Sequence, residues 1–168
     1  MSDSLTDAAI HPKGPRMADD SPPRLVLIVT GSSLRAEELD RPLGYYLQQQ
    51  VERSARRLDL PIKPLVVSDI RWLNDDNFQK LATISVGGPG VNHLAHSWFE
   101  EIPFSLAVDE QYCIQLDPDL SDLKASIWGM DNASTQIAVS VFVERYLPRF
   151  LEQAAHAPDP IDLDETDD

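Results

Sequence analysis

One stretch near the middle of the chain decides the fold: Thr83-Ile84-Ser85-Val86-Gly87-Gly88-Pro89-Gly90-Val91-Asn92. Its first four residues have strand character, its glycines and proline form a turn, and helix-like sequence follows over residues 91–101. α/β proteins hold ligands on such strand–turn–helix units. The stretch therefore predicts a ligand site, or else a tight turn that binds nothing.

The turn has its own chemistry. Glycine permits a positive φ and a close approach of backbone or ligand. We expect a positive φ at Gly88, so that Gly88→Val is more damaging than Ser33→Ala. Gly87 precedes Gly88, and Asn92 is placed to cap the next helix or to bond a ligand. The spacing of Gly88 and Gly90 lacks the third glycine of the dinucleotide fingerprint, so the turn identifies no cofactor.

Upstream, a near-continuous apolar run over residues 24–30 predicts a strand buried on both faces, as in a parallel sheet. A second strand is expected over residues 62–68, and the opening stretch supplies the third. Between the first two, residues 37–58 form an amphipathic helical pattern. Asp40 or Arg41 marks the start of that helix, because Pro42 then falls in its first turn.

Downstream, residues 104–108 and 111–116 are strand-like runs joined by two residues, which predicts a hairpin. A further strand over residues 124–128 precedes a helix that runs from Ser134 to about residue 155, with a kink at Pro148. Strands that alternate with amphipathic helices predict one three-layer α/β domain over residues 24–152. Its central sheet should be largely parallel, with one antiparallel hairpin.

The ends differ in composition from this domain. Residues 1–23 are rich in Ser, Asp and Pro, and residues 152–168 carry seven acidic side chains without Lys or Arg. Such segments bury too little apolar surface to fold, so residues 1–23 and 153–168 are expected to be disordered. The formal net charge of the 168-residue chain is −14, which argues against nucleic acid as a partner.

The sequence also gives an expectation for location. It contains no apolar run long enough for a secretory signal or a membrane helix. Its single cysteine, Cys113, has no partner for an internal disulfide and fits a reducing compartment. We therefore expect a cytoplasmic protein that does not bind membranes.

The candidate binding residues follow from the predicted sheet. The carboxyl ends of parallel strands share one edge, where open α/β sheets bind ligands. A helix N-terminus at that edge favours an anion, so a small anionic ligand is expected. The residues gathered there are Ser32, Asp69, Gly87, Gly88, Asn92, Asp131 and Thr135.

Neither a metal nor a catalytic set is predicted. His93 and His96 are three residues apart, without the further ligands of a zinc signature. Ser32 is not in a Gly-x-Ser-x-Gly elbow. Two functions stay open. The first is a non-catalytic interaction or assembly module for a protein partner or a small anionic ligand. The second is a small enzyme for a nucleotide or sugar phosphate, with Asp69 or Asp131 as acid or base.

Two motifs bear a family resemblance. The run Gly87-Gly88-Pro89-x-x-Asn92 resembles a turn of surface-layer protein domains. The run Gly129-x-Asp131-x-x-x-Thr135-x-x-Ala138 resembles a helix opening of those domains and of related cell-wall-binding modules. The resemblance implies a Rossmann-like α/β module used for assembly. Because the chain has no signal segment and has an acidic tail, only this fold element is carried over.

Overall fold

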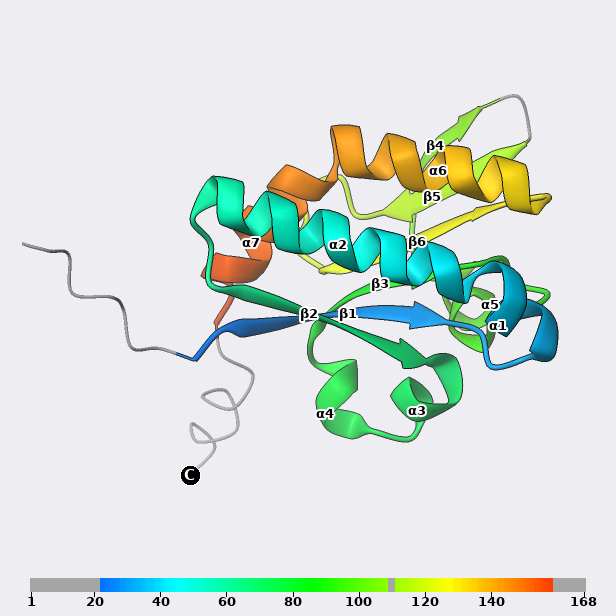
Figure 1. Ribbon diagram of the computed structural model, residues 1–168, viewed down its shortest axis with the longest axis horizontal. Coiled ribbons are helices and arrows are strands. Elements are labelled where there is room, and N and C mark those ends of the chain that lie inside the picture. Colours follow the sequence, from blue (N-terminus) through cyan, green and yellow to red (C-terminus); the bar gives the residue numbers. More distant parts are fainter. Residues whose placement is uncertain (1–21, 109–110, 159–168) are drawn as a thin grey trace, which may run out of the picture.

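The computed structural model describes residues 22–108 and 111–158, and these form one six-stranded sheet with helices on both faces (Figure 1). The predictions for residues 1–21 and 159–168, and for the link between the hairpin strands, lie outside the described residues. The strands are β1 (Arg24–Thr30), β2 (Ile62–Ser68), β3 (Ala82–Val86), β4 (Phe104–Val108), β5 (Tyr112–Leu116) and β6 (Lys124–Gly129).

The strand order is β2-β1-β3-β6-β5-β4. The four strands β2, β1, β3 and β6 pair in parallel, whereas β5 is antiparallel to both β6 and β4. The predicted α/β fold with a largely parallel sheet and an antiparallel hairpin is confirmed. This arrangement is Rossmann-like, with the hairpin extending one edge of the parallel part.

Two apolar layers explain why β1 is a continuous apolar run. Val26 and Ile28 belong to a large core beneath the long helices, whereas Leu27 and Val29 belong to a second core on the opposite face. All four side chains are fully buried. A strand covered on both faces needs apolar residues at every position, which the sequence of β1 supplies.

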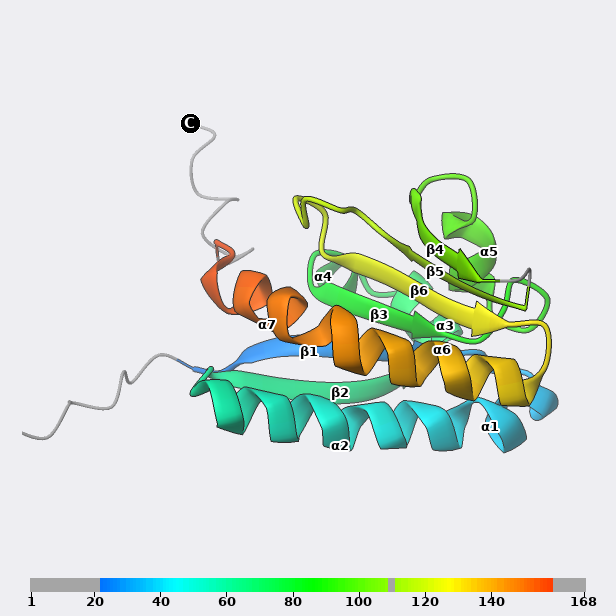
Figure 2. The ribbon, with the colours of Figure 1, turned by 90° about the horizontal axis from the view of Figure 1, so that it is seen from above.

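The helices divide between the two faces of the sheet. Figure 2 shows α2, α6 and α7 on one side and α3, α4 and α5 on the other. The helices are α1 (Leu34–Leu39), α2 (Arg41–Leu58), α3 (Asp69–Leu73), α4 (Asp76–Gln79), α5 (His93–Trp98), α6 (Asn132–Arg145) and α7 (Leu147–His156).

Some helix bounds differ from the sequence prediction. The short helix α1 was not predicted, because its six residues are too few for a periodic apolar face. The expected helix after residue 134 is two helices that meet at Tyr146, with Pro148 in the first turn of α7. Helix α7 continues to His156, into the segment assigned to the tail, because Phe150, Leu151 and Ala154 bury its apolar face.

The strand order places a switch point between β1 and β3. From β1 the chain passes through α2 to β2 on one side, and from β2 it passes through α3 and α4 to β3 on the other side. The segments that leave the carboxyl ends of β1 and β3 therefore diverge to opposite faces. A crevice at such a point is where open α/β sheets bind ligands.

Candidate functional site

Asn92 joins the turn after β3 to two strands and to α5. The side chain is 1% exposed, and its Nδ2 donates to the Val29 and Val86 carbonyl oxygens at 3.3 and 3.1 Å and to Ser85 Oγ at 3.1 Å. Its Oδ1 caps α5 by accepting two backbone N–H groups at 2.9 and 3.3 Å. Both ends of the Asn92 amide are thus hydrogen-bonded within the fold. The capping role predicted for Asn92 accounts for the bonds to Oδ1 but not for those from Nδ2.

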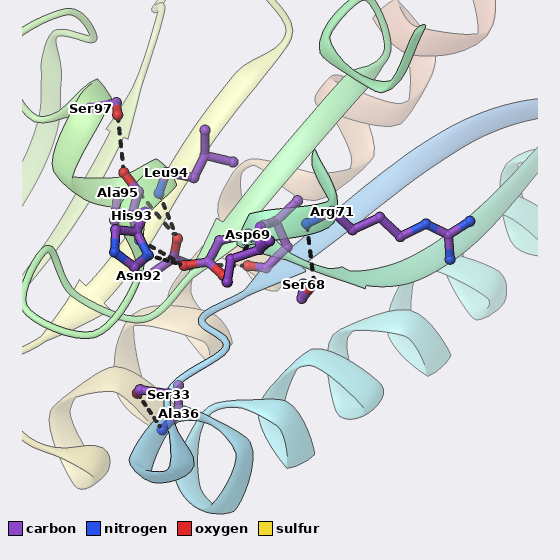
Figure 3. A network of polar contacts seen from close by, with 12 residues as sticks. Ser33, Ala36, Ser68, Asp69, Arg71, Asn92, His93, Leu94, Ala95 and Ser97 are labelled. Atoms are coloured by element: carbon purple, nitrogen blue, oxygen red, sulfur yellow. Dashed lines mark hydrogen bonds and ion pairs between the residues drawn. The ribbon is translucent and has the colours of Figure 1, made fainter. Parts of the chain in front are cut away.

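Asp69 follows β2 and is also fully buried. Its Oδ2 accepts the His93 backbone N–H and lies 2.9 Å from His93 Nδ1, while Oδ1 accepts the Ile70 N–H at 2.8 Å (Figure 3). The Ser32 hydroxyl donates to the same carboxylate. Burial raises the pKa of Asp69, but the hydrogen bonds from His93, Ser32 and Ile70 outweigh burial and hold it below its ordinary value.

The partner of Asp69, His93, is a residue that sequence reasoning considered only as a metal ligand. Its side chain is 71% exposed, and only Nδ1 faces the Asp69 carboxylate. A carboxylate beside Nδ1 favours the tautomer with the proton on that nitrogen. Nε2 is then an acceptor, and within the described residues it has no hydrogen-bond partner.

A pocket of about 410 Å³ lies on the other side of the switch point, over the carboxyl ends of β3 and β6. Its walls come from α1, the turn after β3, the loop after β6 and the start of α6. Its volume is within the range of small-molecule sites. The predicted residues Gly88, Asp131 and Thr135 line this pocket, whereas Ser32, Asp69 and Asn92 are not among its lining residues.

The polar groups of Asp131 and Thr135 are engaged by the opening of α6. Asp131 caps the helix by accepting the Ser134 N–H at 2.8 Å and the Ser134 hydroxyl at 2.7 Å, which holds the pKa of Asp131 below its usual value. The Thr135 hydroxyl accepts the Gly129 N–H at 3.0 Å and donates to the Asp131 carbonyl at 2.8 Å. These two candidates therefore shape the pocket while their hydrogen bonds stay within the chain.

The glycine with a positive φ is Gly87, at 105°, and not Gly88 as the sequence analysis expected. A Cβ on Gly87 would lie 2.6 Å from Asp40 Oδ2, whereas a Cβ on Gly88 would meet the Trp128 ring at an ordinary 3.7 Å. Sequence alone does not show which of two adjacent glycines has the positive φ. Here the difference comes from the packing of Asp40, at the end of α1, against the turn. Because Gly87 has no side chain, the Asp40 carboxylate can pack directly against the turn.

Asp40 is the pocket residue that sequence reasoning missed. It lies between α1 and α2, and the sequence marked it only as a helix start, yet its side chain makes no capping bond. The residue is 7% exposed, and its carboxylate has no hydrogen bond to any described residue. Burial raises the pKa of Asp40 from 3.8 to about 6, and the positive charge of Arg35 offsets part of this rise.

No group of three or more His, Cys, Asp or Glu residues within residues 22–108 and 111–158 is arranged to hold a metal ion. No helix among these residues has the length and apolar character needed to cross a membrane. His93 is engaged by Asp69, and His96 is exposed one turn further along α5.

The site therefore has two halves at one sheet edge. The closed half consists of Ser32, Asp69, Asn92 and His93. The open half is the pocket that contains Asp40. No model of a known protein family matches the chain, and neither does any curated protein sequence.

Proposed function

We propose that this protein is a non-catalytic α/β module that binds a small ligand or a partner segment in the pocket over β3 and β6. The observation that carries the proposal is the buried carboxylate of Asp40, which lines the pocket without a hydrogen-bond partner among the described residues. The residue is buried as a whole, but its carboxylate oxygens are not among the fully enclosed side-chain atoms without a partner, so they can be reached from the pocket. A ligand that donates to Asp40 would give this carboxylate the hydrogen bonds that the described residues do not supply.

The other polar groups of the pocket support binding rather than chemistry. Asp131 and Thr135 are held in the first turn of α6 by short internal hydrogen bonds. General acid–base catalysis needs groups that are free to exchange a proton with a substrate. These side chains instead fix the walls, which suits a preformed recognition site.

The sequence predicts an anion as the ligand, and α6 presents its N-terminus to the pocket. Asp131 already supplies a negative charge at that end. The charged lining residues are the carboxylates of Asp40 and Asp131 and the guanidinium of Arg35. Two carboxylates and one guanidinium favour a ligand that donates hydrogen bonds. Anionic, neutral and cationic compounds should therefore be compared in the binding experiment.

A thermal-shift screen with metabolites tests the binding proposal. A compound that binds the pocket should raise the melting temperature of the wild type and should do so less in Asp40→Asn. Asp119→Asn is the matched control, because Asp119 is an exposed acidic residue outside the pocket. Equal stabilisation of wild type and Asp40→Asn by every active compound would contradict a site built on Asp40.

An enzyme acting on a nucleotide or sugar phosphate is the second candidate, and the Asp69–His93 pair favours it. A buried carboxylate that orients an imidazole, with the other ring nitrogen outward, is the geometry of a general base. Hydrolysis assays with nucleotide and sugar phosphates test this function. Turnover that is lost in His93→Ala and kept in His96→Ala would favour the enzyme over the binding module.

The proposal places the module in the cytoplasm. Its support is the single cysteine, Cys113, which is buried and unpaired in β5. Burial raises the pKa of its thiol to about 12, so the thiol is inert at neutral pH. Fractionation of cells that express the full-length chain, with a cytoplasmic marker as the control, tests the location.

A further inference from the structure

We propose that the pocket over β3 and β6 recognises an organic ammonium group, which donates to the Asp40 carboxylate while its alkyl part packs against Trp128. This inference rests on the ligand site proposed above and names the chemical class of its ligand. Two features carry it: a buried carboxylate, Asp40, and an aromatic side chain, Trp128, that both line the pocket.

The acceptor is held in place by the backbone around it. The Asp40 N–H donates to the Ala36 carbonyl, and the Asp40 carbonyl accepts from Gly44, both at 2.9 Å. The carboxylate then lies over Gly87, where even a Cβ would come within 2.6 Å of Oδ2. It is positioned without being paired, and a charged N–H donor forms the strongest hydrogen bond with such a carboxylate.

The wall is formed by Trp128, at the end of β6. A Cβ on residue 88 would lie 3.7–3.9 Å from three atoms of this side chain, so glycine at that position leaves part of Trp128 open to the pocket. The Phe99 ring packs against the indole, with the ring centroids 6.2 Å apart. An indole offers a large apolar surface, against which the alkyl part of the ligand can pack. Leu39 and Met130 add apolar surface for an alkyl chain.

The two sides of the pocket are tied together. Asn132, in the first turn of α6, donates from Nδ2 to the Leu39 carbonyl at the end of α1, at 3.2 Å. This bond links elements that are 93 residues apart in sequence. A pocket with fixed walls loses little freedom on binding, which favours recognition of a small ligand.

The charge balance selects the sign of the ligand. Two carboxylates, Asp40 and Asp131, and one guanidinium, Arg35, line the pocket. The net charge of the full chain is −14, which raises the local concentration of cations. Arg35 is exposed, but its charge acts on the Asp40 carboxylate and lowers the pKa that burial has raised, so it opposes an ammonium ligand there.

The test uses three probes of one shape: n-butylammonium, n-butanol and butyrate. Each is titrated into the full-length 15N-labelled protein, and the amide shifts of Gly88, Gly129 and Asn132 are followed. We expect n-butylammonium to shift these amides in a saturable way. We expect Asp40→Asn to weaken this binding by about tenfold or more, the effect of losing about 1.4 kcal/mol.

Arg35→Gln is the second variant, because it changes an exposed residue and should strengthen n-butylammonium binding while it weakens butyrate binding. The expected change in n-butylammonium affinity of Arg35→Gln keeps the inference testable if Asp40→Asn does not fold.

Equal binding of n-butanol and n-butylammonium would overturn the ammonium assignment, as would weaker n-butylammonium binding in Arg35→Gln. Tighter binding of butyrate would also overturn it, yet would leave the proposed ligand pocket intact. The absence of amide shifts with all three probes would overturn the ammonium inference, and the metabolite screen would then decide the proposed function separately.

Discussion

Asp69 and Asp40 are two buried carboxylates at the same sheet edge, and their surroundings are opposite. Asp69 is 0% exposed and accepts hydrogen bonds from His93, Ile70 and Ser32, so its pKa lies below the ordinary value. Asp40 is 7% exposed and has no such bond among the described residues, and burial raises its pKa to about 6.

The difference shows that burial alone does not tell whether a carboxylate is hydrogen-bonded within the fold. In the closed half, the Asn92 amide joins β1 and β3 to α5, and the Asp69 carboxylate joins the end of β2 to α5. In the open half, the fold holds a charged group at a cost and leaves its acceptor atoms facing a pocket. Perturbed carboxyl groups of this kind gather at functional sites. The predictions that follow test whether the closed half serves stability and the open half serves binding.

The largest expected effect is in the closed half. Asn92→Ala removes the cap of α5 and the buried Nδ2 hydrogen bonds to the oxygens of Val29, Val86 and Ser85. We expect the free energy of unfolding to fall by about 3 kcal/mol in denaturant titrations. The matched change in the open half is Asn132→Ala, which removes the bond to the Leu39 carbonyl and an exposed bond from Gln136, and should cost about 1 kcal/mol or less. Equal losses for the two variants would remove the distinction between the halves.

Gly87→Ala is expected to have the next largest effect. The new Cβ must be accommodated at a φ of 105° and 2.6 Å from Asp40 Oδ2. We expect a loss of about 2 kcal/mol from backbone strain and displacement of the carboxylate. Gly90→Ala is the control, since its Cβ would have no heavy atom within 4 Å, and thermal melts of both variants measure the difference. A Gly87→Ala protein as stable as Gly90→Ala would show that the turn is not constrained by Asp40.

A smaller effect of opposite sign is expected for Asp40→Asn. The folded-state pKa of Asp40 lies above the unfolded value of 3.8, so the folded protein loses stability as pH rises from about 3.8 to about 6. A shift of this size corresponds to about 3 kcal/mol. Because asparagine keeps an unpaired amide, we expect a gain of about 1–2 kcal/mol above pH 6 and none below pH 3.8. Chemical denaturation at pH 3.5 and pH 7.5 measures both limits.

The matched variant of the closed half, Asp69→Asn, should behave in the opposite way. The folded-state pKa of Asp69 is lowered, so its contribution to stability is present above the unfolded value and disappears as pH falls through the folded one. Asp69→Asn should therefore destabilise the protein at neutral pH and less so in acid. Stabilisation of the protein by both substitutions at neutral pH would contradict the contrast between the two carboxylates.

Much of the fold could be predicted from local sequence. The two-sided burial of β1 shows in its unbroken apolar run, and the hairpin of β4 and β5 shows in two strand-like runs with a two-residue link. The bounds of α1 could not be predicted in the same way, because six-residue helices carry no clear period. Pro148 signalled a kink, and the structure instead has a break between α6 and α7 at Tyr146, with Pro148 in the first turn of α7.

The candidate site was less accessible to sequence reasoning. Ser32, Asp69 and Asn92 could be placed at the sheet edge because each follows a strand or the turn after one. Their internal partners could not be foreseen: Ser32 bonds Asp69, Asp69 bonds His93, and Asn92 bonds Ser85. These bonds turn three expected ligand contacts into internal ones. Asp40 carried only the signal of a helix start, because its burial arises from the packing of the α1–α2 junction over Gly87.

The central claim is that the Asp40 carboxylate is buried and unpaired, poised for a ligand. A 13C NMR titration of the side-chain carboxyl groups measures this state directly. The structure predicts a midpoint near pH 6 for Asp40 and a midpoint below 3.8 for Asp69 in the same sample. An Asp40 carboxyl that titrates at or below 3.8 would show that the group is solvated or paired, and would contradict the account.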